Sequence, residues 1–132
     1  MTEPLTFGWE EWVGLPGLGL PAIKAKIDTG AKTSALHAFD IEAFGPASHP
    51  KVRFAVHPIP GNDLISIPCS ADILDRREVT SSNGETELRY VIGTELRVAD
   101  RTWPIEITLT DRGTMAYRML LGRQALGDEV II

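Results

Sequence analysis

The residues best suited to chemistry in this chain are Asp28-Thr29-Gly30-Ala31, which directly follow the apolar-alternating residues 23–27. A strand with that alternation delivers the Asp28 carboxylate straight into a tight turn. Gly30 can take a positive φ at little steric cost, and the Thr29 hydroxyl can tie the loop down. A carboxylate presented in this way can accept and return a proton, so Asp28 is a candidate general base and acid.

A second motif lies near the C-terminus, where the apolar run Met119-Leu120-Leu121 leads into Gly122-Arg123 and a short helical stretch over residues 124–126. Retroviral-type aspartic peptidases pair an Asp-Thr-Gly-Ala strand with a later apolar-apolar-Gly-Arg strand in the same order. Asp-Thr-Gly alone is also an ordinary turn signal. The ordered pair of motifs is therefore what indicates an acid-protease site.

The resemblance to one family extends well beyond these two motifs. When residues 9–20 are added to the three stretches given below, the resemblance covers nearly the whole chain. It implies an aspartic peptidase that hydrolyses peptide bonds, with Asp28, Thr29 and Gly30 as its catalytic residues. Three stretches resemble the bacterial retropepsin-like family that carries the label "ATP-dependent zinc protease": residues 24–37 (KAKIDTGAKTSALH), 75–84 (DRREVTSSNG) and 109–125 (LTDRGTMAYRMLLGRQA).

Length and composition favour a single all-β domain over residues 1–132. A chain of 132 residues with 43% apolar content supports one core and leaves no room for a second. Nine prolines and twelve glycines punctuate short runs rich in β-branched and aromatic residues. The spacing predicts a small closed retropepsin-like barrel with one short C-terminal helix, built from strands at residues 7–15, 23–28, 34–44, 52–58, 64–70, 72–80, 87–97, 102–110 and 118–121.

The N-terminal residues and the single cysteine favour a cytoplasmic protein. Glu3, Glu10 and Glu11 stand where a secretory signal would need basic residues and an unbroken apolar run. No apolar stretch reaches the length of about 18 residues that a membrane span requires. Cys69 has no partner for an internal disulfide, which agrees with a reducing compartment. We therefore expect a cytoplasmic location and no membrane partner.

The presence of one Asp-Thr-Gly sequence predicts a homodimer. Aspartic peptidases activate water between two carboxylates that share a proton. Asp63 and Asp100 lie in turns, and Asp111 has no glycine directly behind it. Two copies of Asp28 that meet on a two-fold axis supply the pair most simply, and the resemblance implies the same arrangement. Relatives of this kind usually continue through a further short strand, whereas residues 127–132 form only a short apolar tail, which leaves the stability of the dimer open.

Basic residues gather in the stretches that carry the resemblance, although the net charge of the chain is −5. The acidic balance argues against nucleic acid as a partner. Arginine binds carboxylates in bidentate pairs, so a convergence of arginines suits an acidic peptide. The family is associated with glutamate-ligating enzymes of the ATP-grasp class, and the resemblance implies trimming of oligoglutamate tails from a protein. The residues expected to bind substrate are Ala31, Lys32, Thr33, Ser34, His37, Arg76, Arg77, Arg89, Arg112 and Arg118.

The same basic residues have a simpler interpretation, because acidic residues lie beside them in the sequence. Each arginine could be solvated or could pair with Asp75, Glu78 or Asp111. Arg123 is expected in a structural ion pair or a dimer contact. The polar hairpin tip of residues 78–86 is a candidate flap over the site, with an ordinary exposed hairpin as the alternative.

Other classes of function receive less support from the sequence. The same barrel could bind acidic tails without cutting them. A serine or threonine hydrolase built on Ser34 or Ser81 with His37 lacks the Gly-x-Ser-x-Gly elbow. The chain has no His-Glu-x-x-His and no Cys-x-x-Cys, and the glycine-rich residues 14–19 lack the Lys-Ser or Lys-Thr of a phosphate loop. We therefore expect neither a metal nor another cofactor.

Overall fold

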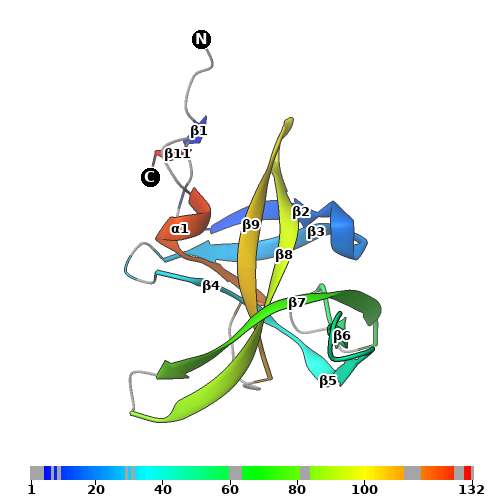
Figure 1. Cartoon of the computed structure of the whole chain (residues 1–132). Helices are drawn as coiled ribbons and strands as arrows, with labels where there is room; N and C mark the ends of the chain where they lie inside the picture. Colours follow the sequence, from blue (N-terminus) through cyan, green and yellow to red (C-terminus); the bar gives the residue numbers. More distant parts are fainter. Residues whose placement is uncertain are drawn as a thin grey trace.

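β-strands make up most of the molecule, which a computed structural model shows as a closed barrel from which a long hairpin extends (Figure 1). Within the described residues the helical elements are the 3-10 turn η1 (Pro16–Leu18) and the helix α1 (Arg123–Leu126). The prediction of an all-β barrel with a short C-terminal helix is confirmed. The structure describes residues 5–6, 8, 10–28, 30, 32–59, 64–80, 84–111, 117–126 and 130–131.

Six strands form the barrel, and their bounds are β2 (Glu10–Leu15), β3 (Leu20–Ile27), β4 (Ser34–His37), β8 (Thr86–Val98), β9 (Arg101–Thr110) and β10 (Met119–Leu121). They pair in the order β2, β3, β10, β4, β9, β8. The ring closes where Arg97 of β8 pairs with Gly14 of β2. Closure of a sheet on itself pairs strands that would otherwise leave open edges.

The short strand β10 lies between β3 and β4, which are consecutive in the sequence. It runs parallel to β3, with Leu121 opposite Ile27, and antiparallel to β4, with Met119 opposite Leu36. Two distant parts of the chain are therefore adjacent at this end of the barrel. The residues that follow Ile27 and Leu121, namely Asp28 and Gly122, leave their strands side by side.

A second antiparallel group of strands continues from β8, in the order β7 (Ile67–Thr80), β6 (Lys51–Val56) and β5 (Phe39–Phe44). The sequence predicted two strands over residues 64–80, whereas β7 is continuous and has a register shift between Ile73 and Asp75. β7 and β8 form a long hairpin, and Gly84 near its tip has a φ of +87°, which suits glycine. The tip itself, residues 81–83, lies outside the described residues.

The core of the barrel consists of apolar side chains from alternate strand positions. In β3, for example, Leu20, Ile23, Ala25 and Ile27 are buried while Lys26 is exposed. Full burial of a side chain such as Leu or Ile stabilises a fold by about 1.5–3 kcal/mol. The fully buried large side chains are Leu15, Leu20, Ile23, Leu36, Val52, Val56, Val91, Ile92, Leu96, Ile107, Met119 and Leu121. This core fixes the strands that carry the Asp28 turn.

Two terminal strands form a separate small sheet. β1 (Leu5–Thr6) pairs in parallel with β11 (Val130–Ile131), so Leu5 lies opposite Val130. Figure 1 shows this pair standing apart from the barrel, beyond α1. In the described parts of the chain, no helix has the length and apolar character needed to cross a membrane.

Candidate functional site

Asp28 sits where β3 ends, and its side chain is half-buried. The backbone N–H of Asp28 donates a hydrogen bond of 2.9 Å to the carbonyl oxygen of Leu121. The N–H of Gly30 donates to Oδ1 of Asp28 at 3.2 Å. A Cβ atom at residue 30 would lie 3.3 Å from the same oxygen, so glycine allows this close approach. The backbone of Asp28 is therefore fixed by the end of β10, and one of its carboxylate oxygens is fixed by the N–H of Gly30.

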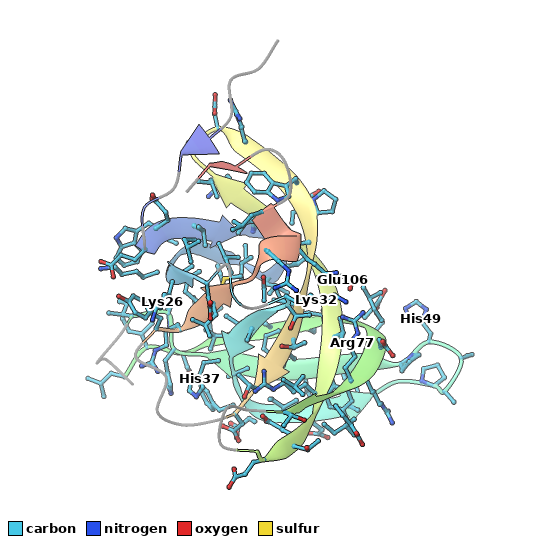
Figure 2. The ribbon with its side chains drawn as sticks, turned by 90° about the vertical axis from the view of Figure 1, so that its left-hand side faces the viewer. Lys26, Lys32, His37, His49, Arg77 and Glu106 are labelled. Carbon is cyan, nitrogen blue, oxygen red and sulfur yellow. The ribbon has the colours of Figure 1, made fainter. Side chains whose placement is uncertain are left out.

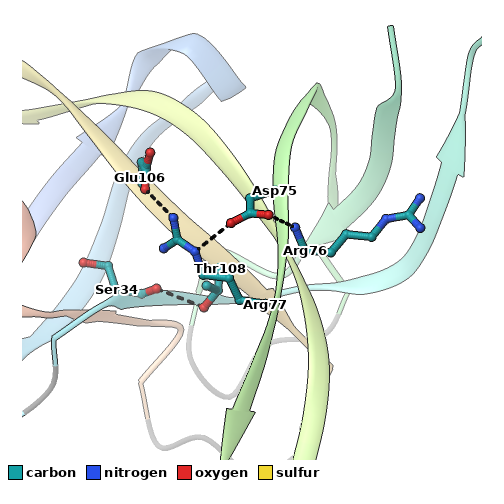
Figure 3. Close-up of polar contacts among 6 residues, drawn as sticks. All are labelled: Ser34, Asp75, Arg76, Arg77, Glu106 and Thr108. Carbon is teal, nitrogen blue, oxygen red and sulfur yellow. Dashed lines mark hydrogen bonds and ion pairs between the residues drawn. The ribbon is translucent and has the colours of Figure 1, made fainter. Parts of the chain in front are cut away.

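Ser34 is buried beneath this turn and links three segments of the barrel. Its hydroxyl oxygen accepts a hydrogen bond of 3.0 Å from the N–H of Gly122. Its carbonyl oxygen accepts one of 3.0 Å from the Thr108 hydroxyl, as Figure 3 shows. Because only 1% of the residue is exposed, Ser34 supports the site from within rather than contacting substrate as predicted. The same burial removes it as a candidate nucleophile.

The helix α1 holds the turn from the other side. Nη1 of Arg123 donates to the carbonyl oxygen of Gly30 at 3.3 Å. The N–H of Gln124 donates to the carbonyl oxygen of Lys32 at 3.2 Å. Arg123 was predicted in a structural ion pair or a dimer contact, whereas the contact found for it here is a hydrogen bond to a backbone carbonyl of the Asp28 turn. The side chain of Lys32 is exposed beside this turn.

A pocket of about 440 Å³ opens next to the turn. Lys32 and Thr33, both predicted to bind substrate, line it. Figure 2 shows Lys32, Arg77 and Glu106 on the same side of the molecule, away from Lys26 and His37. The complete lining consists of Lys32, Thr33, Arg77, Glu78, Val79, Thr80, Glu106, Thr108 and Gln124. Three of these, Glu106, Thr108 and Gln124, were not predicted for the site. Glu106 and Thr108 reach the pocket from positions of β9 that no motif marks, whereas Gln124 lies in the motif of residues 109–125 but was expected only as part of a short helix.

Arg77 is the central charged residue of this pocket. Its Nε donates to Oδ2 of Asp75 at 3.0 Å, and its Nη2 donates to Oε1 of Glu106 at 3.1 Å (Figure 3). The pKa of Asp75 is lowered, first by the backbone N–H of Arg76 and then by the Arg77 guanidinium. Two cations, Lys32 and Arg77, and two carboxylates, Glu78 and Glu106, line the pocket. The predicted positive cleft is therefore balanced by acids of the same chain.

The predicted convergence of arginines is only partly correct. Arg76 and Arg77 are neighbours on β7, so their side chains leave opposite faces of the strand, as Figure 3 shows. The Arg76 guanidinium lies 5.3 Å from the centre of the Tyr90 ring, away from the pocket. Arg89 is largely buried and forms an ion pair of 3.0 Å with Glu87. The alternation of side chains along a strand is the feature of the sequence that predicts Arg76 and Arg77 on opposite faces of β7.

His37 and Arg118 lie where β4 meets the segment that precedes β10. His37 is buried, and its backbone N–H donates to the carbonyl oxygen of Arg118 at 2.8 Å. Arg118 is half-buried. Neither residue lines the pocket. Thr29, Ala31 and Arg112, which were also predicted for the site, and Ser81 and the centre of the candidate flap lie outside the described residues.

The other two histidines have local partners in the part of the chain that holds β5, β6 and β7. A ring nitrogen of His49 lies 3.0 Å from Oδ1 of Asp72. His57 stacks on Phe39 at 4.3 Å between ring centres, and its Nδ1 lies 3.0 Å from the carbonyl oxygen of Ile65. Figure 2 shows His37 and His49 in different parts of the molecule.

Residues 6–132 match a protein-family model described as "RimB-like: Retropepsin-like aspartic endopeptidase RimB". Two relatives are named "Probable alpha-L-glutamate ligase". The one from Shewanella pealeana is 46% identical over 125 residues, which cover 95% of this chain and 27% of the relative. The one from Parasynechococcus marenigrum is 47% identical over 132 residues, covering 100% of this chain and 28% of the relative. Neither is named as a zinc protease, so that label is not confirmed.

A solved structure shares the fold. The crystal structure of Lpg0085 from Legionella pneumophila, a protein of unknown function, superposes with a TM-score of 0.78 at 26% sequence identity. The match covers 96% of this chain and 91% of that one. The barrel and its hairpin are therefore shared by a protein whose sequence has diverged considerably. By contrast, the chain spans little more than a quarter of the length of the relatives named as ligases.

Proposed function

This chain belongs to the RimB-like family of retropepsin-like aspartic endopeptidases, and we propose that it hydrolyses peptide bonds with Asp28 as its catalytic acid. The observation that supports this most directly is the presentation of Asp28. Its backbone is tied to Leu121, one carboxylate oxygen receives the N–H of Gly30, and the side chain remains partly exposed. A catalytic carboxylate requires this combination of fixed geometry and access.

We propose further that two chains assemble so that their Asp28 side chains form the catalytic pair. The ionised carboxylate takes a proton from water, the water oxygen attacks the peptide carbonyl, and the protonated partner stabilises the oxygen that develops charge. A proton is then returned to the leaving amine as the C–N bond breaks. In the described residues β1 and β11 pair only with each other, so each has an outer edge to which a strand of a second chain can add.

For the substrate we propose the acidic, oligoglutamate tail of a protein. Lys32 and Arg77 line the pocket beside the Asp28 turn and can bind carboxylates. The matched relatives carry this segment within longer proteins named as glutamate ligases, which supports a role near the products of glutamate ligation. A cytoplasmic location, where such proteins are made, remains part of the proposal.

Replacement of Asp28 by Asn tests the catalytic assignment. We expect D28N to lower the rate of cleavage of a peptide with an oligoglutamate tail by roughly a hundredfold to ten-thousandfold, because the amide cannot exchange the proton. Asp40 provides a matched control, since it is exposed and its φ of +52° suits Asn as well as Asp. D40N should retain activity, and circular dichroism should show both variants folded. Substantial cleavage by D28N would disprove the assignment.

Mixing experiments test the shared pair. If each active unit needs two ionisable Asp28 side chains, an excess of D28N chains should suppress wild-type activity as mixed dimers form. Activity per chain should also fall on dilution below the dimer dissociation constant, as measured by sedimentation. A fully active species that sediments as a monomer would exclude the proposed dimer.

A second candidate function is a module that binds acidic tails without cutting them. One observation favours it: in the relatives named as ligases, this segment is only about a quarter of the protein, where it could serve to hold a substrate. Binding of the oligoglutamate peptide with equal affinity by wild type and D28N, together with no cleavage by wild type, would support this function over the peptidase.

A further inference from the structure

Glu106 stands at the boundary between two cavities. The pocket of about 440 Å³ beside the Asp28 turn lies on one side of it. A cavity of about 990 Å³ lies on the other. Glu106 and Gln124 line both spaces, whereas Arg77 lines only the smaller one. The Glu106 side chain therefore has open space on the side that faces away from Arg77.

The ion pair between Arg77 and Glu106 is suited to replacement of Glu106 by a carboxylate from another molecule. Only one of the guanidinium nitrogens, Nη2, contacts Glu106, while Nε is held by Asp75. The two side chains are 37% and 53% exposed, so water screens their attraction and the pair is weak. Loss of the Glu106 contact would leave Arg77 oriented by Asp75. One donor position of an already oriented guanidinium would then be open to another carboxylate.

We propose that Glu106 is a specificity-determining residue that occupies Arg77 until a substrate carboxylate replaces it. In this exchange an acidic side chain of the substrate binds Nη2 of Arg77, and Glu106 turns into the larger cavity, whose lining includes the cation Lys51 and the carboxylates Asp72 and Glu95. Charge on Arg77 remains compensated throughout. A neutral side chain offers nothing to replace Glu106, so the pocket selects against it. This inference rests on the proposed binding of an acidic tail.

The alternative is that Glu106 only braces Arg77, and the two roles predict opposite effects of Glu106→Gln. If Glu106 competes with the substrate, its neutralisation should tighten binding of an acidic peptide. If it braces Arg77, the same change should weaken binding. Glu42 is the matched control, because it also forms an exposed ion pair with an arginine, Arg53, at 2.9 Å, and it lines neither cavity. Glu42→Gln removes the same charge from the chain without touching the exchange.

Binding is measured by fluorescence anisotropy in the D28N chain, so that no peptide is cut. The probes are a labelled peptide with an oligoglutamate tail and the same peptide with glutamines. We expect E106Q to lower the Kd for the glutamate peptide about threefold or more, and E42Q to leave it nearly unchanged. In an Arg77→Met background the effect of E106Q should disappear, because the pair acts as a unit.

Three results would overturn the inference: weaker binding with E106Q, an equal gain with E42Q, or the same gain when Arg77 is absent. Failure of the glutamate peptide to bind any variant would overturn it as well. The outcome is separate from the peptidase proposal, which depends on cleavage by the wild-type chain. Tight, Glu106-dependent binding without cleavage would uphold the exchange and reject the peptidase.

Discussion

The hydroxyl oxygen of Ser34 accepts the backbone N–H of Gly122 across 3.0 Å, inside the barrel. This contact joins the first residue of β4 to the residue that follows β10, and both are buried. Since Leu121 at the end of β10 also holds the backbone of Asp28, the Ser34 hydroxyl supports the Asp28 turn through one intervening strand. The turn is thus built by contacts between segments far apart in the sequence.

Ser34→Ala should therefore destabilise the protein by about 1–3 kcal/mol, because it leaves the buried N–H of Gly122 without its acceptor. Urea unfolding followed by circular dichroism measures the change. Ser70→Ala is the control: Ser70 is exposed on β7, and its removal should alter the free energy of unfolding by less than about 0.5 kcal/mol. Equal stability of the two variants would show that the Ser34 contact contributes little.

Lys32→Gln should raise the KM for an oligoglutamate peptide by roughly threefold while leaving kcat nearly unchanged, since Lys32 is exposed beside the pocket and screened by water. The matched variant is Lys26→Gln, which removes an exposed lysine that lines neither cavity. Steady-state kinetics on acidic and glutamine-tailed peptides gives the comparison. An equal effect on both peptides would argue against carboxylate recognition by Lys32.

Cys69 should make the protein less stable at alkaline pH. Burial raises the pKa of its thiol from 9.0 to about 11. The folded state therefore holds the proton more tightly than the unfolded state, and this stabilisation is complete below about pH 9 and lost as the pH rises towards 11. Between about pH 8 and pH 10, the free energy of unfolding of wild type should fall more than that of Cys69→Ala. Parallel pH curves for the two proteins would contradict this.

Ala99→Asn should stabilise the protein by about 0.5–1 kcal/mol. Ala99 begins the two-residue turn between β8 and β9 with a φ of +54°, a conformation that asparagine adopts more readily than alanine. Thermal unfolding measures the difference. Ala47→Asn, in an exposed turn where no positive φ occurs, is the control and should bring no gain. A lower melting temperature for Ala99→Asn would show that the turn needs alanine for another reason.

Much of the fold follows from local patterns in the sequence. Residues 102–110 were predicted as a strand that matches β9 (Arg101–Thr110) closely, because alternation and β-branched residues are local signals. Residues 34–44 were predicted as one strand, whereas the structure has β4 and β5 separated at Ala38. Asp40, with a φ of +52°, lies in β5 where its pairing with β6 shifts register. The local sequence does not indicate a positive φ at a residue other than glycine, so the break between β4 and β5 was not predicted.

The site was less predictable than the fold. The turn after Asp28 was predicted from its motif, and pairing of an arginine with Asp75 was predicted as an alternative, but the ion pair of Arg77 with Glu106 was not. Arg77 and Glu106 lie on β7 and β9, which are separated in the sheet by β8, so their ion pair depends on pairing across three strands. Sequence spacing carries no information about such a pair. The buried position of Ser34 likewise depends on the insertion of β10, which only the assembled barrel reveals.

The placement of β10 between β3 and β4 also means that the two parts of the Asp28 turn are synthesised at different times. A ribosome produces Asp28 early, but the strand that holds its backbone, ending at Leu121, emerges much later. A nascent chain therefore carries the aspartate without the framework that orients it.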